Sequence, residues 1–438
     1  MTKTKDFAEG LPSKYEQGDL STLPVDEIVT LVRQRHNARK AGLHEDLRIG
    51  TPEGMFSWAV PKFLPEEPVE RRLAVRQPLH RWSYNEYEGL LGPGYGEGEV
   101  SRIEKSPVVI TKKSPGHIAF TRGDKKNAPT YNLIHTGGDN WLVSVGKQSQ
   151  PDVVKKYKKE HFKSIPVEAV PKMVAEGAVL TPKIDGAGAL LYMGKKGPEV
   201  YGIRDSVTGE KPSYTDIIGG LRGYAVPDPL RGRMFRGELY GIRGGTVIPP
   251  NELAGVLNST LLNAVGKRQS SGLRLMMALL AEHKKGQDVY DTSGVGEVVK
   301  LLRHPAVAAV PGYEGKEASK LLSGILSGKN KLTSEGVVVH APGKRPLKAK
   351  AREDYDVVIR DIFKADTQGD NRAGGFSYSL PGRSDIVGRV GTGFSHDLLR
   401  DMLRNPELYK GKTARIYSQG QYPTGAYRAP SFISLKED

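Results

Sequence analysis

Gly177-Ala-Val-Leu-Thr-Pro-Lys-Ile-Asp-Gly186 is the most informative stretch of the chain, because it places Lys183 two residues before Asp-Gly at the end of an apolar run. Such a run is typical of a buried strand. A lysine amine attacks only when it is neutral, and its ordinary pKa is about 10.4. The tetrapeptide also arises by chance, and Asp-Gly is equally typical of a hairpin turn. A role for Lys183 as a covalent nucleophile therefore depends on partners elsewhere in the chain.

Residues with suitable chemistry follow Lys183 in the sequence. Lys348 and Lys350 point the same way if they lie on a strand, and two such cations lower the pKa of a neighbouring amine and offset charge on a phosphate. Two carboxylates are suited to a nucleotide ribose and to Mg²⁺. The full candidate set is Lys183, Asp185, Arg204, Glu238, Glu335, Lys348 and Lys350. Together these residues fit attack on the α-phosphate of a nucleoside triphosphate.

Composition narrows the class of protein. The chain has 438 residues, 37% of them hydrophobic and 26% charged, which predicts several globular domains. No apolar run is long enough for a membrane span, and the N-terminus does not read as a signal peptide, so we expect a cytoplasmic protein with no membrane partner. Cysteine is absent, which excludes disulfides and cysteine-ligated metal sites. The net charge of +15 favours a polyanionic partner such as nucleic acid.

The pattern along the chain predicts an α+β multidomain protein. We expect an N-terminal tail, a β-rich N-terminal domain, an exposed helical basic linker, an α+β domain and a small C-terminal β-barrel of the oligonucleotide-binding (OB-fold) type. The expected boundaries are 1–20, 21–147, 148–165, 166–353 and 354–438. Helices are expected at 251–263, 273–285, 296–303 and 396–404.

The ordered set around Lys183 resembles the covalent nucleotidyltransferase superfamily of polynucleotide ligases and mRNA capping enzymes. The C-terminal segment 427–438 looks like the closing segment of ATP-dependent DNA ligases. The resemblance implies that Lys183 becomes linked to AMP, that ATP and Mg²⁺ are the cofactors, and that Glu238 and Glu335 contribute to metal binding. Three departures concern the nucleotide pocket: Thr181 and Gly188 stand where the family has Glu and Arg, and Met276-Met277 stands near the position of an aromatic-Asp pair.

A second candidate site lies near the N-terminus. If residues 43–49 form a strand, His44, Asp46 and Arg48 project from one face, and His36 adds a further ligand. Two histidines and a carboxylate hold Mn²⁺ or Zn²⁺ with open positions, and an arginine binds phosphate. From spacing alone, an ordinary surface cluster is the favoured explanation of these residues.

Motifs that follow in order make residues 30–147 similar to the 3′-phosphoesterase domain of bacterial ligase D proteins. They include Phe56-Ser-Trp-Ala-Val-Pro-Lys62, His80-Arg-Trp-Ser-Tyr84 and the glycine-rich run 89–98. The resemblance implies that His36, His44 and Asp46 bind Mn²⁺, and that the scissile phosphate is engaged by Arg48, Arg72, His80 and Tyr84, with Arg48 and His80 catalytic. The connection between the two histidines is two residues longer than in the family, so it either bulges out or displaces His36.

These resemblances predict an ATP-dependent DNA ligase that works through a lysyl-AMP intermediate. Its N-terminal domain would supply the 3′-hydroxyl by Mn²⁺-dependent removal of a terminal phosphate or ribonucleotide. The expected partner is double-stranded DNA with nicks or ends, including ends with 3′-ribonucleotides, and the expected state is a monomer. Two alternatives stay open: an N-terminal domain that is an inactive nucleic-acid clamp, and an RNA ligase or capping-type nucleotidyltransferase.

Overall fold

The computed structural model of the protein describes residues 17–436 apart from 69, 95, 125–127, 147–149, 207–208, 328, 331, 334, 352, 366–370, 419 and 423. Most of the predicted tail and the start of the predicted linker lie outside these residues. The chain forms two compact units, Met1–Glu160 with Gly186–Val310, and His161–Asp185 with Pro311–Asp438. The predicted domain boundaries stay predictions. Within the described part of the chain, no helix has the length and apolar character needed to cross a membrane.

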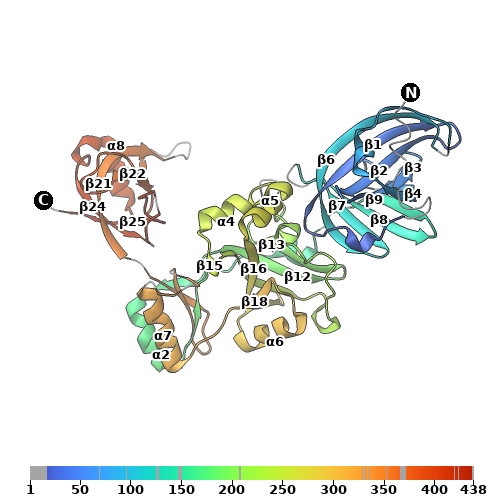
Figure 1. Ribbon diagram of the computed structural model, residues 1–438. Helices are drawn as coiled ribbons and strands as arrows, with labels where there is room; N and C mark the ends of the chain where they lie inside the picture. The colour runs from blue at the N-terminus through green and yellow to red at the C-terminus, as the bar shows by residue number, and fades with distance from the viewer. Residues whose placement is uncertain are drawn as a thin grey trace. The chain divides into compact units, whose positions relative to one another are not determined.

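The N-terminal part of the first unit is a closed barrel of eight strands in the order β1-β2-β3-β4-β9-β8-β7-β6, with β6 pairing back to β1 (Figure 1). The strands are β1 (Ile28–Ala38), β2 (Gly42–Thr51), β3 (Gly54–Val60), β4 (Arg71–His80), β6 (Gly98–Ser114), β7 (His117–Thr121), β8 (Thr130–Gly137) and β9 (Asn140–Val145). Alternate residues such as Leu47, Ile49 and Trp58 fill one apolar core. Outside the ring, β5 (Gly89–Leu91) pairs with β6 and follows the short helix η2 (Trp82–Glu86).

The rest of the first unit is a sheet in the order β13-β12-β14-β16-β17, with β15 and β18 added at β14 and β16. Its strands are β12 (Ala187–Gly194), β13 (Gly197–Gly202), β14 (Met234–Arg243), β15 (Thr246–Val247), β16 (Arg274–Lys284), β17 (Gln287–Val289) and β18 (Val307–Ala309). Its helices are α3 (Thr215–Ile218), α4 (Pro250–Leu257), α5 (Leu261–Ser271) and α6 (Thr292–Leu302), with a 3-10 turn at η4 (Asp228–Leu230).

The helix predicted at 273–285 is wrong, because this segment is strand β16. It pairs with β14 at one edge and with β17 and β18 at the other, and the consecutive residues Leu275–Leu279 are all buried, so both of its faces are covered as well. A continuous apolar run does not distinguish a buried strand from a buried helix by periodicity. The helix predicted at 296–303 is confirmed in α6, and the one at 251–263 is divided into α4 and α5 at Asn258–Thr260.

The second unit contains a four-stranded sheet, ordered β10-β20-β19-β11, and a five-stranded sheet, ordered β23-β22-β21-β24-β25. The strands of the first are β10 (Lys163–Ile165), β11 (Val179–Pro182), β19 (Gly336–His340) and β20 (Leu347–Lys350), and its helices are α2 (Val170–Ala175) and α7 (Gly315–Leu326). The strands of the second are β21 (Glu353–Lys364), β22 (Ala373–Ser379), β23 (Gly388–Val390), β24 (Thr413–Ser418) and β25 (Ser431–Leu435).

Helix α8 (His396–Arg404) packs on the five-stranded sheet and confirms the helix predicted at 396–404. Ser395 caps its N-terminus by accepting a hydrogen bond from the backbone N–H of Leu398 at 3.2 Å. Leu399 and Met402 are buried against the sheet core. Several short strands with one helix match the sequence expectation, and the OB-fold assignment of this region stays a prediction.

The predicted exposed helical linker is corrected by the structure. Between residues 150 and 165, only α1 (Asp152–Lys156) is an α-helix, and the side chains of Val154 and Tyr157 are buried against the sheet of the first unit. The charge pattern of this segment gave no indication of these two apolar anchors. They are three residues apart and therefore lie close together on one side of a helical turn.

Candidate active sites

Three potential metal ligands meet on the β1–β2 hairpin. His36 and His44 are directly opposite each other across the two strands, and Asp46 lies two residues beyond His44 on the same face. His36 Nδ1 is 3.4 Å from one carboxylate oxygen of Asp46, and His44 Nε2 is 3.4 Å from the other. All three side chains are buried, and their ligand atoms lie within 4.8 Å of one another.

The hydrogen bonds of the two imidazole rings indicate which kind of ligand the cluster can bind. A carbonyl oxygen only accepts, so His36 Nε2–H donates to Gly96 O at 3.0 Å and His44 Nδ1–H donates to Gly42 O at 2.9 Å. In the neutral rings the remaining nitrogens present lone pairs toward the Asp46 carboxylate, an arrangement that a cation bound between them would satisfy. Two ligand atoms about 2.1 Å from a common ion are separated by roughly 3–3.5 Å, which fits the observed spacing. The residues therefore fit a divalent cation, with the carbonyl contacts fixing both rings.

The longer connection between the histidines does not displace His36. Pairing of β1 with β2 continues through Asn37↔Leu43 to Ala38↔Gly42, so the extra residues lengthen the hairpin beyond the cluster. Gly42 has a φ of +73°, which a glycine adopts without strain. The cross-strand pairing of His36 with His44 is preserved because the extension adds residues on both sides of the turn.

Arg48 is buried beside the cluster and connects it to neighbouring segments. Its NH2 donates to Asp46 at 3.0 Å, and its NH1 donates to the side-chain oxygen of Gln34. Gln34 is fully buried and donates to the backbone carbonyls of Tyr84 at 3.3 Å and Tyr87 at 2.8 Å. Burial alone would raise the pKa of Asp46, but Arg48 and the two histidines outweigh it and hold that pKa well below its usual range.

His80 and Tyr84 complete this group. The rings of His80 and Tyr84 lie 5.2 Å apart, and the Arg48 guanidinium lies 4.6 Å from the Tyr84 ring centre. Burial and the positive charge of Arg48 lower the pKa of His80 to about 3, so its imidazole is neutral at pH 7. Burial raises the pKa of Tyr84 to about 12. Arg48 Nε is buried with no hydrogen-bond partner among the described residues, as expected where an anionic ligand is absent.

Arg72 is not brought to this group. Its NH2 forms an ion pair with Glu70 at 2.7 Å, and its cross-strand neighbour is the core residue Val143. Arg72 therefore lies on the core-facing side of β4. The residue of β4 that is in line with Ala59 and Asp46, on the face that carries the cluster, is Val75. Gln34 was missed by sequence reasoning, although its position two residues before His36 on one strand face was a usable signal.

Lys183 lies in the second unit, just beyond β11, and has two of its predicted partners. Its Nζ donates to Glu335 Oε2 at 2.6 Å, and Lys350 Nζ lies 3.1 Å from Glu335 Oε1. Backbone contacts hold the lysine in place, from Lys183 N to Gly336 O at 2.9 Å and from Thr333 Oγ1 to Lys183 O at 2.6 Å. The Glu335 carboxylate thus bridges two ammonium groups. This arrangement fits ion pairing, and magnesium binding by Glu335 stays a prediction.

The four-stranded sheet has one apolar and one polar face here. Leu180, Val337 and Ala349 belong to the core. On the other face Val338 is flanked by Thr181 of β11 and Lys348 of β20, and Lys350 follows Lys348 after two residues. Thr181 shares a 3.0 Å hydrogen bond with Nε2 of His340. Burial lowers the pKa of His340 to about 4.

The remaining predicted residues lie in different surroundings. Asp185 forms an ion pair with Arg428 within the second unit. In the first unit, Glu238 is half-buried on β14 opposite Gly188, and Arg204 is exposed after the end of β13. A Cβ added at Gly188 would lie 2.8 Å from Ile203 Cδ1, which explains a small residue at this position. Roles for Arg204, Glu238 and Asp185 stay predictions.

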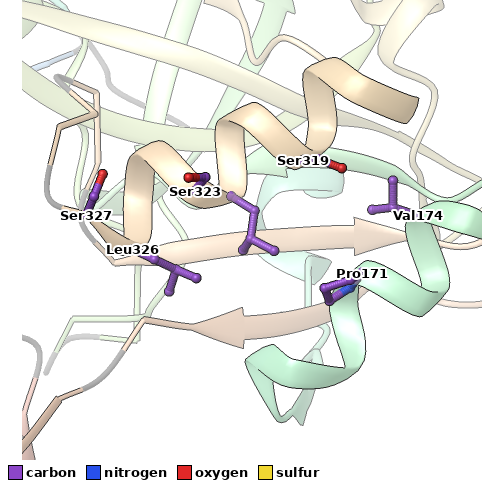
Figure 2. Close-up of a pocket in the computed structure, with 7 residues that line it drawn as sticks. Pro171, Val174, Ser319, Ser323, Leu326 and Ser327 are labelled. Atoms are coloured by element: carbon purple, nitrogen blue, oxygen red, sulfur yellow. The ribbon is translucent and has the colours of Figure 1, made fainter.

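A shallow groove between α2 and α7 is separate from these residues. It has a volume of about 470 Å³ and is lined by Pro171, Val174, Ser319, Leu322, Ser323, Leu326 and Ser327. Figure 2 shows Ser319 and Ser323 on α7, Ser327 just beyond its end, and Pro171 and Val174 on α2. None of its lining residues belongs to either predicted site.

Residues 34–133 match the family model described as the DNA ligase D 3′-phosphoesterase domain. The multifunctional non-homologous end joining protein LigD of Mycolicibacterium smegmatis is 27% identical over 418 residues, which cover 85% of this chain and 49% of that protein. LigD of Mycobacterium bovis is 34% identical over 120 residues, or 26% of this chain and 15% of that protein. The resemblance expected from the sequence is confirmed. The chain spans about half the length of the first relative.

Two solved structures of ligases are also similar. One is a Lig E DNA ligase, with 17% identity and a TM-score of 0.43 over 64% of this chain and all of that one. The other is a mycobacterial DNA ligase D in complex with ATP, with 19% identity and a TM-score of 0.28 over 60% of this chain and 90% of that one. With both TM-scores below 0.5, the proposals below rest on the sequence matches and the site geometry.

Proposed function

We propose that this chain is a LigD-like DNA-joining enzyme that prepares a 3′ end with its N-terminal barrel and seals the break with ATP through Lys183. The observation that carries the proposal is the convergence of His36, His44 and Asp46, beside Arg48, inside the stretch that matches the phosphoesterase model. The two activities are complementary, because sealing requires a free 3′-hydroxyl.

In the barrel, His36, His44 and Asp46 would hold Mn²⁺. A bound divalent ion supplies Lewis-acid stabilisation of phosphate charge. Arg48 is oriented by Gln34 and Asp46 to donate to a phosphate oxygen. His80 is neutral and buried beside Tyr84, and its Nδ1–H donates to Pro78 O at 2.8 Å, so its Nε2 would accept a hydrogen bond from the substrate.

In the second unit, Lys183 Nζ would first lose a proton, for which its hydrogen-bond partner Glu335 is the nearest acceptor, and the neutral amine would then attack the α-phosphorus of ATP as the bond to pyrophosphate breaks. Glu335 holds Lys183 and Lys350 together, and Lys348 lies on the same strand face as Lys350. The lysines offset the phosphate charge that develops during the transfer. The AMP would then pass to a 5′-phosphate, and a 3′-hydroxyl would displace it.

The ligase half is tested by incubating the chain with α-labelled ATP or GTP. We expect a covalent adduct with ATP that is labile in acid and stable in alkali, as a lysine phosphoramidate is, and that is abolished in Lys183→Arg, which keeps the charge but not the nucleophile. Lys195→Arg, at an exposed lysine in the β12–β13 turn, is the matched control and keeps the adduct. The absence of an adduct with either nucleotide would refute this half.

The processing half is tested on a duplex that ends in a 3′-phosphate or a 3′-ribonucleotide. We expect Mn²⁺-dependent removal by the parent chain and at least a 100-fold loss in His44→Ala. His135→Ala, at an exposed histidine of the same barrel, should behave like the parent. If the parent does not process either end but still binds DNA, the barrel is a nucleic-acid clamp.

A further inference from the structure

The lysine-rich segment before the second unit is fixed to the sheet of the first unit. Val154 is fully buried and Tyr157 is 3% exposed, and both pack with Leu190, Tyr201, Ile203 and Met234. Further back, the side chain of Gln150 accepts from Lys211 N at 3.3 Å and also donates to Lys211 O. Side chains thus attach this segment at three successive points.

A buried polar network holds the last of these points. The Tyr157 hydroxyl donates to Asp288 Oδ2 at 2.8 Å, and the Tyr157 ring meets the edge of His283 at 5.0 Å. The Asp288 side chain is fully buried, receives Arg236 NH1 at 3.2 Å and lies 2.9 Å from His283 Nδ1. Burial raises the pKa of the Tyr157 phenol, which keeps its proton in place. A segment that only connects two domains would need no buried anchor of this kind, because burying charged groups costs free energy.

The anchors place four cations on a fixed backbone. Lys155, Lys156, Lys158 and Lys159 are exposed on either side of Tyr157, and Asp152 and Glu160 flank them. Two exposed lysines follow His283, whose ring contacts Tyr157: Lys284 at the end of β16, which forms an ion pair with Glu282 at 2.7 Å, and Lys285 in the turn after it. Lysines held in this way neutralise phosphates with less loss of backbone freedom than lysines on a flexible chain.

We propose that residues 155–159 form a binding surface for the phosphate backbone of DNA, in addition to the two candidate sites. This inference rests on the proposed DNA-joining function. Lysine side chains contact phosphates without reading base edges, so the surface would act independently of sequence. Its contribution would be affinity and placement of the duplex, with no part in the chemical steps.

The test uses the full chain with Lys155, Lys156, Lys158 and Lys159 all replaced by Gln. The control replaces Lys195, Lys196, Lys316 and Lys320, which are exposed elsewhere and give the same change in net charge. Binding of a nicked duplex is measured at several salt concentrations. We expect the segment variant to bind at least tenfold more weakly at about 0.15 M salt, with the slope of log K against log salt reduced by about two to four. The control should change less than threefold.

Tyr157→Phe tests the anchor, because it keeps the ring in the core and removes the bond to Asp288. We expect Tyr157→Phe to bind the nicked duplex more weakly than the parent and more tightly than the four-lysine variant. An affinity equal to that of the parent would refute the anchoring role. Adduct formation with labelled ATP needs no DNA and should equal the parent in every variant. No adduct in the parent refutes the proposed function. If adduct formation is normal, either of two results overturns this inference alone. One is equal DNA binding by the parent and the segment variant, and the other is a loss of DNA binding in the control that equals the loss in the segment variant.

Discussion

At the scale of single residues, the N-terminal site depends on a side chain that no motif identified. Gln34 lies in the row of Asp46 on the barrel, and its amide joins Arg48 to the backbone of η2. A glutamine in a strand is chemically unremarkable in sequence, whereas His36, His44 and Asp46 are conspicuous ligand types. Its importance arises from its complete burial, because a buried amide must be satisfied by specific partners.

Replacing Gln34 by Leu should reduce 3′-end processing by about 10- to 100-fold, because Arg48 loses the acceptor that orients it. Binding of Mn²⁺, measured by equilibrium dialysis, should change little since His36, His44 and Asp46 are untouched. Gln269→Leu, at an exposed position of α5, serves as the control. Equal loss of metal binding and of processing would show that Gln34 supports the fold of the cluster and not the orientation of Arg48.

His340 should make folding stability depend on pH. Its pKa is about 4 in the folded chain against 6.5 for the free side chain, so the unfolded chain takes up the proton first as the pH falls. This contribution is complete above about pH 6.5 and is lost progressively down to about pH 4. Between pH 7 and pH 5, the parent should lose up to about 2 kcal/mol more than His340→Gln in urea unfolding. Parallel pH profiles of the two chains would contradict this expectation.

At the scale of elements, strand register determines which residues meet. In the β1–β2 hairpin the pairing His36↔His44 continues past the cluster to the turn, so the insertion is absorbed without moving the ligands. In the four-stranded sheet, Thr181 and Lys348 flank Val338 and leave the core to Leu180, Val337 and Ala349. A shift of one residue in either register would turn these side chains to the other face.

Gly186 of the Lys-Ile-Asp-Gly motif is required by close packing of strands. A Cβ at this position would lie 2.4 Å from the backbone oxygen of Leu239 on β14. Gly186→Ala should therefore destabilise the chain by about 1–3 kcal/mol, as measured by denaturant unfolding. Gly296→Ala, inside α6 with no atom within 4 Å of the new Cβ, should instead be neutral or stabilising by up to about 1 kcal/mol. Similar effects in both variants would refute the steric explanation.

At the scale of the whole molecule, the two candidate sites lie in parts of the chain that have separate hydrophobic cores. The metal cluster belongs to a closed barrel with its own core, whereas Lys183, Glu335 and Lys350 belong to a sheet of the second unit with another. Ligands of the two sites should therefore stabilise different parts of the chain, because a ligand stabilises only the structure that binds it.

In differential scanning calorimetry, Mn²⁺ should raise the temperature of one transition and ATP that of another. At a ligand concentration of about 100 times Kd the stabilisation is about 2.7 kcal/mol. His44→Ala should remove the Mn²⁺ shift and leave the ATP shift unchanged. A single transition that responds equally to both ligands would indicate that the sites unfold as one cooperative unit.

The sequence by itself determined the chemistry that is available and much of the local structure. Residue type and short-range periodicity are local properties, so the sequence alone predicts His36, His44 and Asp46 as candidate ligands, Lys183 with Glu335 and Lys350 as a charged site, and 396–404 as a helix. Only the tertiary structure decided which neighbours those residues have. Burial made segment 273–285 a strand, placed Arg72 opposite the core residue Val143, brought Gln34 to Arg48 and anchored Tyr157 on Asp288. These outcomes depend on contacts between distant segments, which compete with local propensity and are not encoded in spacing along the chain.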